Sequence, residues 1–436
     1  MFRLILPLVI EQLLAVIMGA ADTVMVSPVG EFAVSGVNII DNINNLFIIA
    51  FIALSTGGAV VCSQYLGRQD PKSASIAAKQ LIYVVVLVSI VITGLALLFR
   101  SQVISLIYGR LDDDVMDASM VYFLFTALSY PTLALYNACA ALFRSAGNSR
   151  IPMLVALFIN ILHIAGNALF LYVIPMGVAG VALSTFLCRV IAGAVTFFML
   201  IKIRAFPISL SGILKVQFAP SMIRRVLNIG IPTTLENSMF QFGRLFTQRI
   251  FPLFGTSVIA ANAAANLLCS ISYMPGNAFG IALLTVIGQC IGAGDYAAAK
   301  KLTRKILTIT WITILTMSGI TLIFRYPLVS IFNLGADARA EAVVFLVIHS
   351  VALGLGWVFS FGLPNALRAA GDAKYVMIAA TISMWTVRVS AAYFITFTLG
   401  VGPAGVWLAM GIDFIVRGTC YFLRWRGGRW QKMKVI

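Results

Sequence analysis

Long apolar runs recur along the whole chain, and they restrict its fold more than any other feature. A helix needs about 20 apolar residues to cross about 30 Å of hydrocarbon. Twelve runs approach or exceed that length, at 4–27, 32–64, 76–99, 115–142, 151–173, 178–201, 222–252, 257–290, 303–324, 340–369, 375–398 and 403–423. They are continuous rather than alternating, so they are not the strands of a membrane barrel. Because 61% of the 436 residues are hydrophobic and 11% are charged, the sequence predicts an all-α polytopic membrane protein.

The positive charges are distributed unequally between alternate loops. With the N-terminus in the cytoplasm, the loops and tails on that side hold 22 Lys and Arg residues, whereas the opposite loops hold four. This bias follows the positive-inside rule and predicts a multi-pass protein of the plasma (inner) membrane with both termini cytoplasmic. The net charge of +16 therefore reflects topology and attraction to membrane lipids rather than nucleic-acid binding.

The second half of the chain repeats the first at an offset of 224 or 225 residues. The matched positions include Pro7 and Pro232, Glu11 and Glu236, Gln64 and Gln289, Asp70 and Asp295, and Arg144 and Arg368. Six runs separate equivalent points, so both halves have the same orientation in the membrane. We expect two parallel-repeat six-helix lobes, 1–203 and 222–436, joined by a cytoplasmic linker at 204–221, around a central cavity. Within each repeat, GRQDP (67–71) and GAGD (292–295) predict the end of one helix and the start of the next.

No motif in the chain indicates an enzyme. The six cysteines lie within the apolar runs without metal-ligand spacing, which favours small apolar packing residues. The sequence has no phosphate-binding loop and no pairing of a nucleophile with a base. We therefore predict no catalytic residues, no resident metal and no cofactor, and a process driven by an ion gradient.

A few charged residues remain inside the apolar runs. The first half holds Glu11, Asp22, Asp41 and Arg189, and the second holds Glu236, Asp413, Arg244, Arg249, Arg388 and Arg417. Each costs several kcal/mol in hydrocarbon, so each needs a partner, a wet cavity or a function. Because acids outnumber bases only in the first half, that half is the expected site of a bound cation or an exchangeable proton.

Asp22 is the strongest candidate for a coupling residue. Glu11 and Asp22 share one helix face, about 16 Å apart along the axis. The run 151–173 carries a matching polar stripe of Asn160, His163 and Asn167 at i, i+3 and i+7. We expect these stripes to enclose a polar pocket in which Asp22 exchanges a cation or proton, although hydrogen bonds that merely fix the packing are the alternative.

Other intramembrane charges allow two interpretations each. Asp41, which begins the polar sequence DNINN, either lines the substrate cavity or joins two helices. Glu236 repeats Glu11, and is either a substrate or proton carboxylate or the ion-pair partner of Arg244. We take Asp41, Glu236, Asn160 and Arg244 as candidates for the substrate cavity.

Two arginines of the second half receive structural roles. Arg388 occupies the place of His163 in the repeat, and we expect it to neutralise Asp413 or Glu236. Arg417 lies near the end of the last run, and we expect its side chain to extend toward the membrane surface.

Four segments in order, ADTVMVSPVGEFAVSGV (21–37), ALSTGGAVVCSQYLG (53–67), ALFRSAGNSRIPM (141–153) and MGVAGVALST (176–185), resemble the multidrug and toxic compound extrusion (MATE) family. The resemblance covers nearly the whole chain. It implies a V-shaped pair of six-helix lobes that exchange protons or sodium for organic cations or other amphipathic compounds.

The resemblance also implies a site in the first lobe. The family's acid on the first helix falls on Asp22 and its threonine on the sixth helix falls on Thr185. Its asparagine and aspartate on the fifth helix fall on His163 and Asn167, so this chain departs at both positions. The loss of one carboxylate weakens the case for sodium, and His163 is positioned to relay a proton or to replace the charge of a cation.

A sodium-coupled branch of the family has two further acids in its second lobe. Here those positions are Phe240 and approximately Trp357, so that site is not reproduced. We therefore predict a monomeric exporter of amphipathic or cationic small molecules, coupled to protons in preference to sodium at Asp22, Glu11, His163, Asn167 and Thr185. A lipid-linked sugar flippase of the same superfamily is the alternative; a major facilitator transporter, a receptor or a channel fits less well.

Overall fold

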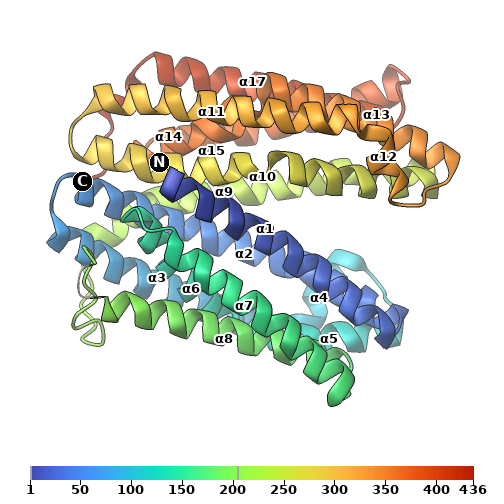
Figure 1. Ribbon diagram of the computed structural model, residues 1–436, viewed down its shortest axis with the longest axis horizontal. Coiled ribbons are helices and arrows are strands. Elements are labelled where there is room, and N and C mark those ends of the chain that lie inside the picture. Colours follow the sequence, from blue (N-terminus) through green and yellow to red (C-terminus); the bar gives the residue numbers. More distant parts are fainter. Residues whose placement is uncertain (1, 204–205) are drawn as a thin grey trace. The chain divides into compact units, whose positions relative to one another are not determined.

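The structure is a computed structural model that describes residues 2–203 and 206–436, except for the side chains of residues 2, 3, 17, 20 and 23. The described residues form helices and contain no strand (Figure 1), which confirms the predicted fold class. Arg204 and Ala205, at the start of the predicted linker, and the side chain of Arg3 lie outside the described residues.

The chain divides into two compact units, Met1–Thr234 and Leu235–Ile436, called here the first and second unit. The elements of the first unit are α1 (Phe2–Val26), η1 (Ser27–Val29), α2 (Glu31–Gly67), α3 (Pro71–Leu98), α4 (Arg100–Tyr108), α5 (Asp113–Leu128), α6 (Tyr130–Ser145), α7 (Arg150–Ala168), η2 (Leu169–Val173), α8 (Val178–Lys202) and the start of α9 (Pro220–Gln248). The remainder of α9 belongs to the second unit.

The second unit continues with η3 (Phe251–Phe254), α10 (Thr256–Gly292), α11 (Tyr296–Ile323), α12 (Arg325–Ser330), α13 (Ala336–Ala352), η4 (Leu353–Gly362), α14 (Leu363–Ala369), α15 (Ala373–Ile382), η5 (Ser383–Val389), α16 (Ser390–Tyr393), η6 (Phe394–Thr398), α17 (Ala404–Arg426) and η7 (Arg429–Lys432). The segments η4, η5 and η6 are π-helical, as is η2 in the first unit. They widen the helices around the polar groups described below.

Each of the twelve apolar runs predicted from the sequence coincides with helix. Among the described residues, nine helical spans are long and apolar enough to cross a membrane, and α5 with α6, bent by 47°, makes a tenth. The other two runs correspond to α1 and α9. Polar and charged residues make α9 less apolar than the spans above, and it is not among the helices that are apolar enough by this measure.

The linker and the start of α9 pack on the first unit. Lys79 and Tyr83 of α3 donate hydrogen bonds to the carbonyl oxygens of Ser211 and Ile213, at 2.5 and 2.6 Å. Farther along, Gly57 of α2 approaches the backbone of Gly230 so closely that a Cβ atom would lie 2.7 Å from the Gly230 nitrogen. Along the chain, the boundary between the two compact units falls inside α9, after Thr234. The predicted lobe limits at 203 and 222 stay a prediction.

The turn between α2 and α3 is repeated between α10 and α11. Asp70 accepts a hydrogen bond from the Ser73 amide at 3.0 Å, and Asp295 accepts one from the Ala298 amide at 2.8 Å. Both acids cap the N-terminus of the following helix, where the backbone amides have no helical partner. The predicted helix breaks at GRQDP and GAGD are therefore confirmed.

The Asp70 cap gives a pH-dependent stability. The hydrogen bonds from Ser73 lower the pKa of Asp70 below its usual value, so the cap stabilises the folded state above about pH 4 and loses this effect as the pH falls through the folded-state pKa. We expect Asp70→Ala to lower the melting temperature at pH 7 and to do so less as the pH approaches 3.

The matched control is Asp112→Ala. Asp112 occupies the N-cap position of α5, but its side chain makes no capping hydrogen bond. Thermal unfolding in detergent across this pH range should show a pH-dependent decrease of the melting temperature for Asp70→Ala and not for Asp112→Ala. An equal loss at every pH, or an equal loss in the control, would contradict the assignment.

Candidate ion-coupling site

Asp22 is the centre of a buried polar group in the first unit. It lies on α1, which runs beside α7 (Figure 1). From α7, the Asn167 side-chain amide donates a hydrogen bond of 2.8 Å to Asp22 Oδ1, and His163 Nδ1 lies 3.4 Å from the same oxygen. His163 and Asn167 are fully buried and Asp22 is 8% exposed. The stripe inferred from the sequence thus faces Asp22.

The second ring nitrogen of His163 contacts α8. His163 Nε2 lies 3.1 Å from Thr185 Oγ1, and Thr185 Oγ1 donates its hydrogen bond to the Val181 carbonyl at 3.0 Å. A hydroxyl group has a single hydrogen to donate. Thr185 is therefore the acceptor from His163, and Nε2 must carry a hydrogen.

This assignment leaves Nδ1 of a neutral His163 as a bare acceptor. It faces Asp22 Oδ1, which is also an acceptor when the carboxyl group is ionised. Among the described residues, neither His163 Nδ1 nor Asn167 Oδ1 has a hydrogen-bond partner. Two opposed acceptors repel each other, and one proton placed on either of them converts the repulsion into a hydrogen bond. The geometry of Asp22 and His163 is thus suited to holding one proton.

Asn160, the third residue of the stripe, is also buried. Its amide nitrogen donates to the Ala156 carbonyl within α7 at 2.8 Å, while its Oδ1 has no partner in the part of the chain that the structure describes. It therefore adds an acceptor on the face of α7 that carries His163. Its role in a substrate cavity stays a prediction.

Asp41 connects two helices of the first unit. Tyr122 of α5 donates a hydrogen bond to Asp41 Oδ1 at 3.2 Å, and Tyr130 of α6 donates to Asn44 Oδ1 at 2.7 Å. Of the two interpretations of Asp41, the structure shows the helix–helix bond. Its proposed contact with substrate is not tested by this bond.

The tyrosines were not identified as candidates from the sequence. Tyr122 lies within electrostatic range of both Asp22 and Asp41, and beside Thr185. It belongs to a polar stripe of Tyr122, Thr126, Ser129 and Tyr130 at i, i+4, i+7 and i+8 in the run 115–142. That periodicity is the signal from which they could have been found.

Glu11 and Glu236 form equivalent ion pairs in the two repeats. Glu11 Oε1 lies 2.9 Å from Arg144 Nη1, and Glu236 Oε1 lies 2.6 Å from Arg368 Nη2. The expectation that Glu236 pairs with Arg244 is therefore wrong, because α14 brings Arg368 to it instead. Glu11 is likewise engaged away from the Asp22 group, and its role in coupling stays a prediction.

The structure corrects the prediction for Arg417, and it places Asp413 within electrostatic range of Arg388 without a direct contact. Asp413 accepts a hydrogen bond from Ser383 at 2.6 Å and pairs with Arg417 at 3.4 Å. Among the described residues Arg388 forms no ion pair, with Asp413 or with Glu236. Arg417 does not reach the surface: it is 3% exposed, because the ion pair and a 2.8 Å hydrogen bond to Ser360 hold it inside.

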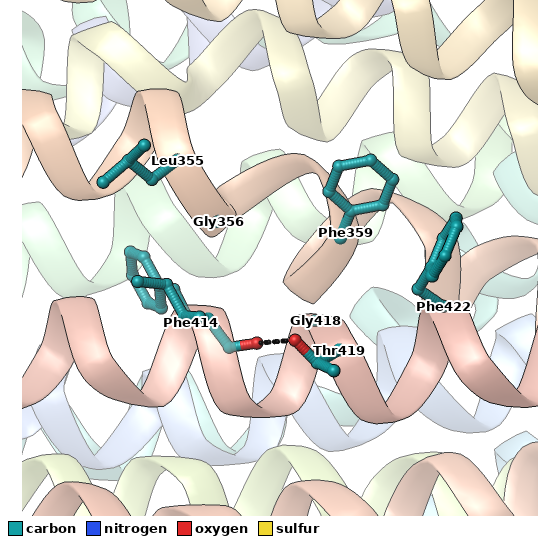
Figure 2. Close-up of a pocket in the computed structure, with 8 residues that line it drawn as sticks. Leu355, Gly356, Phe359, Phe414, Gly418, Thr419 and Phe422 are labelled. Carbon is teal, nitrogen blue, oxygen red and sulfur yellow. Dashed lines mark hydrogen bonds between the residues drawn. The ribbon is translucent and has the colours of Figure 1, made fainter.

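A separate pocket between η4 and α17 carries no charge. Its volume is about 250 Å³, and Leu355, Gly356, Phe359, Phe414, Ile415, Gly418, Thr419 and Phe422 line it (Figure 2). The Thr419 hydroxyl is occupied by a 2.8 Å hydrogen bond to the Ile415 carbonyl. These lining residues offer apolar contact but no group that could bind an ion.

The fold and these sites define a polytopic helical membrane protein of two repeats, each with a buried polar group. The family model MatE matches residues 7–169 and again residues 232–394. The chain belongs to the MatE family. The two matches begin 225 residues apart (232 − 7) and end 225 residues apart (394 − 169), which agrees with the offset inferred from the sequence.

Known proteins resemble this chain along its length. The transporter YisQ of Bacillus subtilis is 31% identical over 437 residues, which cover 99% of this chain and 94% of that one. The probable multidrug resistance protein NorM of Thermotoga maritima is 25% identical over 449 residues, covering 100% and 94%. A crystal structure of MATE in the bent conformation has a TM-score of 0.92 at 18% identity and covers 99% of this chain and 95% of that one. It confirms the two-lobe, twelve-helix fold.

Proposed function

We propose that this protein is a secondary active transporter that exports amphipathic compounds in exchange for protons by alternating access. Membership of a transporter family and the names of relatives such as NorM support multidrug efflux and do not favour a lipid-linked sugar flippase. We place it in the plasma (inner) membrane as a monomer with both termini cytoplasmic. Asp41, Asn160, Glu236 and Arg244 remain the candidates for contact with substrate.

The choice of coupling ion follows from the atom that faces Asp22. Sodium, as a hard cation, is bound by oxygen ligands, and the imidazole nitrogen is better suited to a proton. His163 Nδ1, which has no hydrogen-bond partner among the described residues, lies 3.4 Å from the Asp22 carboxylate. This opposition of two acceptors is the observation that carries the assignment to protons.

Protonation then links three helices of the first unit. With a proton between Asp22 and His163, hydrogen bonds run from Asn167 to Asp22, to His163 and on to Thr185. They join α1 to α7 and α8. Loss of the proton replaces the middle link between Asp22 and His163 by two opposed acceptors, while the bond from Asn167 to Asp22 is kept. The packing of α1 against α7 is therefore expected to differ between the two states. A ligand or proton shifts a conformational equilibrium only through such a difference between states.

The test is efflux from proteoliposomes with the two gradients imposed separately. We expect a pH gradient without sodium to drive uptake or release of a fluorescent amphipathic compound. A sodium gradient at equal pH on both sides should drive none. Transport driven by a sodium gradient at constant pH would contradict proton coupling. An electrogenic flux that does not saturate with substrate concentration would indicate a channel instead.

A further inference from the structure

The second unit contains two buried arginines, Arg388 and Arg417, and an exposed one, Arg244, that the coupling mechanism does not use. We propose that Arg388, Arg417 and Arg244, around Phe240, bind an anionic group of the substrate, such as a carboxylate, phosphate or sulfonate on an aromatic body. We call these residues the arginine cluster. This inference rests on the proposed transport function and names a substrate class for it.

Two guanidinium groups of the cluster meet on one aromatic ring. The Cζ atom of Arg388, from η5, lies 5.3 Å from the centre of the Phe240 ring, and that of Arg417, from α17, lies 5.2 Å from it. Arg417 also lies 4.5 Å from the ring centre of Phe361. Arg388 is 7% exposed and Arg417 is 3% exposed. The charges are thus held away from water and close together.

The cluster is not neutralised by the described residues around it. Arg388 lies within electrostatic range of Arg417, Arg244 and a single carboxylate, that of Asp413. The two buried positive charges, Arg388 and Arg417, against one buried negative charge leave a net charge of +1, and the exposed Arg244 adds a third positive charge. The other buried acids of the unit, Glu236 and Asp372, are engaged by Arg368 and Arg424. Buried charges without partners are strongly unfavourable in a membrane protein, so the site lacks an anion.

The unused hydrogen-bonding atoms also indicate an anion. Within the described part of the chain, Nε and Nη1 of Arg388 have no hydrogen-bond partner, and neither has Nη2 of Arg417, whose contact with Asp413 is long. In the first unit, by contrast, the unused atoms of Asn160 and Asn167 are amide oxygens, and that of His163 is the ring nitrogen Nδ1. The unused acceptor that faces Arg417 is Oδ2 of Asp413, at 3.4 Å. A further acceptor, best an ionised one, would complete the unused donors of Arg388.

The internal repeat places this cluster at the counterpart of the proton site. Arg388 follows His163 by 225 residues (388 − 163), the offset of the two family matches. At the same offset from Asp22 the second repeat has Thr247. The acid and imidazole of the first repeat are therefore replaced by a hydroxyl and a permanent cation, which cannot bind a proton reversibly but can bind an anion.

Aromatic side chains beside the cluster suit an aromatic ligand body. Trp357 stacks on Phe361 with ring centres 5.4 Å apart and on Tyr273 at 6.2 Å. Phe240 contacts Phe361 edge-on at 5.8 Å. Such rings bury apolar area and pack against aromatic ligands. A ligand whose charged group contacts the arginines and whose flat aromatic body packs on these rings would use both features.

Matched probes of opposite charge test the proposal. Naphthalene-2-carboxylate and 2-naphthylmethylammonium share one body, and calorimetry on the full chain in phosphatidylcholine nanodiscs, with empty discs subtracted, gives their affinities. We expect the carboxylate to bind about tenfold more tightly and Arg388→Gln to weaken it about tenfold, as loss of a charged hydrogen bond does. Asp413→Asn, which removes the competing anion, should strengthen it.

The control variant is Arg249→Gln. Arg249 is exposed and lies on Phe246, 5.3 Å from its ring centre, outside the cluster, so its removal should leave both affinities unchanged. If Arg388→Gln fails to fold, the exposed Arg244→Gln serves instead and should weaken the carboxylate severalfold. Preference for the ammonium probe, or unchanged carboxylate affinity in the Arg388 or Arg244 variant, overturns the proposal.

Two further measurements distinguish the arginine cluster from a site for small anions and from the proton site. Inorganic phosphate alone should compete weakly, because it lacks the aromatic body; complete displacement at equal concentration would mean a site for small anions and would overturn the substrate class. The binding is measured at equilibrium without gradients and should persist in Asp22→Asn. A failure of proton coupling thus leaves anion binding intact, and a failure of anion binding leaves pH-driven transport intact.

Discussion

Replacing Asp22 by Asn is expected to abolish pH-driven efflux while the protein stays folded. The asparagine side chain has the size of Asp22, and its amide oxygen in the place of Oδ1 can still accept from Asn167. The variant therefore keeps the hydrogen bond from α7 but has no proton to bind or release. We expect transport driven by a pH gradient to fall by about 100-fold or more, as for removal of a group that the mechanism requires.

Proteoliposomes that accumulate a fluorescent amphipathic compound measure this loss. Asp112→Asn is the matched control, because Asp112 is an exposed acid at the start of α5 and should transport like the original chain. The melting temperature and equilibrium substrate binding of Asp22→Asn should be unchanged or raised. Transport at the original rate in this variant would show that Asp22 is not the coupling group.

Breaking the ion pair of Glu236 with Arg368 is expected to give the largest loss of stability. The two atoms lie 2.6 Å apart, and the side chains are 9% and 12% exposed. Arg368→Gln leaves the carboxylate of Glu236 largely buried without its counter-charge, a change that costs about 3 kcal/mol. The melting temperature should therefore fall clearly in Arg368→Gln and in Glu236→Gln.

The double variant Glu236→Gln with Arg368→Gln distinguishes a paired charge from two separate roles. Because two amides can bond to each other without net charge, the double variant should recover most of the stability that either single change removes. The single and double variants of Glu11 and Arg144 should show the same recovery of stability, since this ion pair is the equivalent of Glu236 with Arg368 in the first repeat. Strictly additive losses would contradict a mutual pair.

Local patterns in the sequence predicted the fold and the centre of the proton site. The length of an apolar run shows where a helix can cross a membrane, and the i, i+3, i+7 spacing fixes which residues share a face of α7. His163 and Asn167 were therefore expected near Asp22, and Thr185 was expected there from the resemblance to the MATE family. The structure brings all four together.

The partners of other charges depended on packing between helices and could not be predicted. Arg244 lies two turns from Glu236 on the same helix, yet Glu236 is paired by Arg368 from α14. Arg417 stays inside because Ser360 and Asp413 approach it from η4 and from its own helix. The π-helical segments η4 to η6 were also missed, because an apolar run does not reveal a local change of hydrogen-bond register.

Proton release on substrate binding tests the central claim most directly. The protein is first equilibrated in weakly buffered detergent solution at a pH at which a proton is bound between Asp22 and His163. Addition of a transported amphipathic compound should then release close to one proton per molecule of compound bound. Asp22→Asn should bind the compound and release none, while Asp112→Asn should match the original chain. Binding without proton release in the original chain, or equal release from Asp22→Asn, would contradict a proton held between Asp22 and His163.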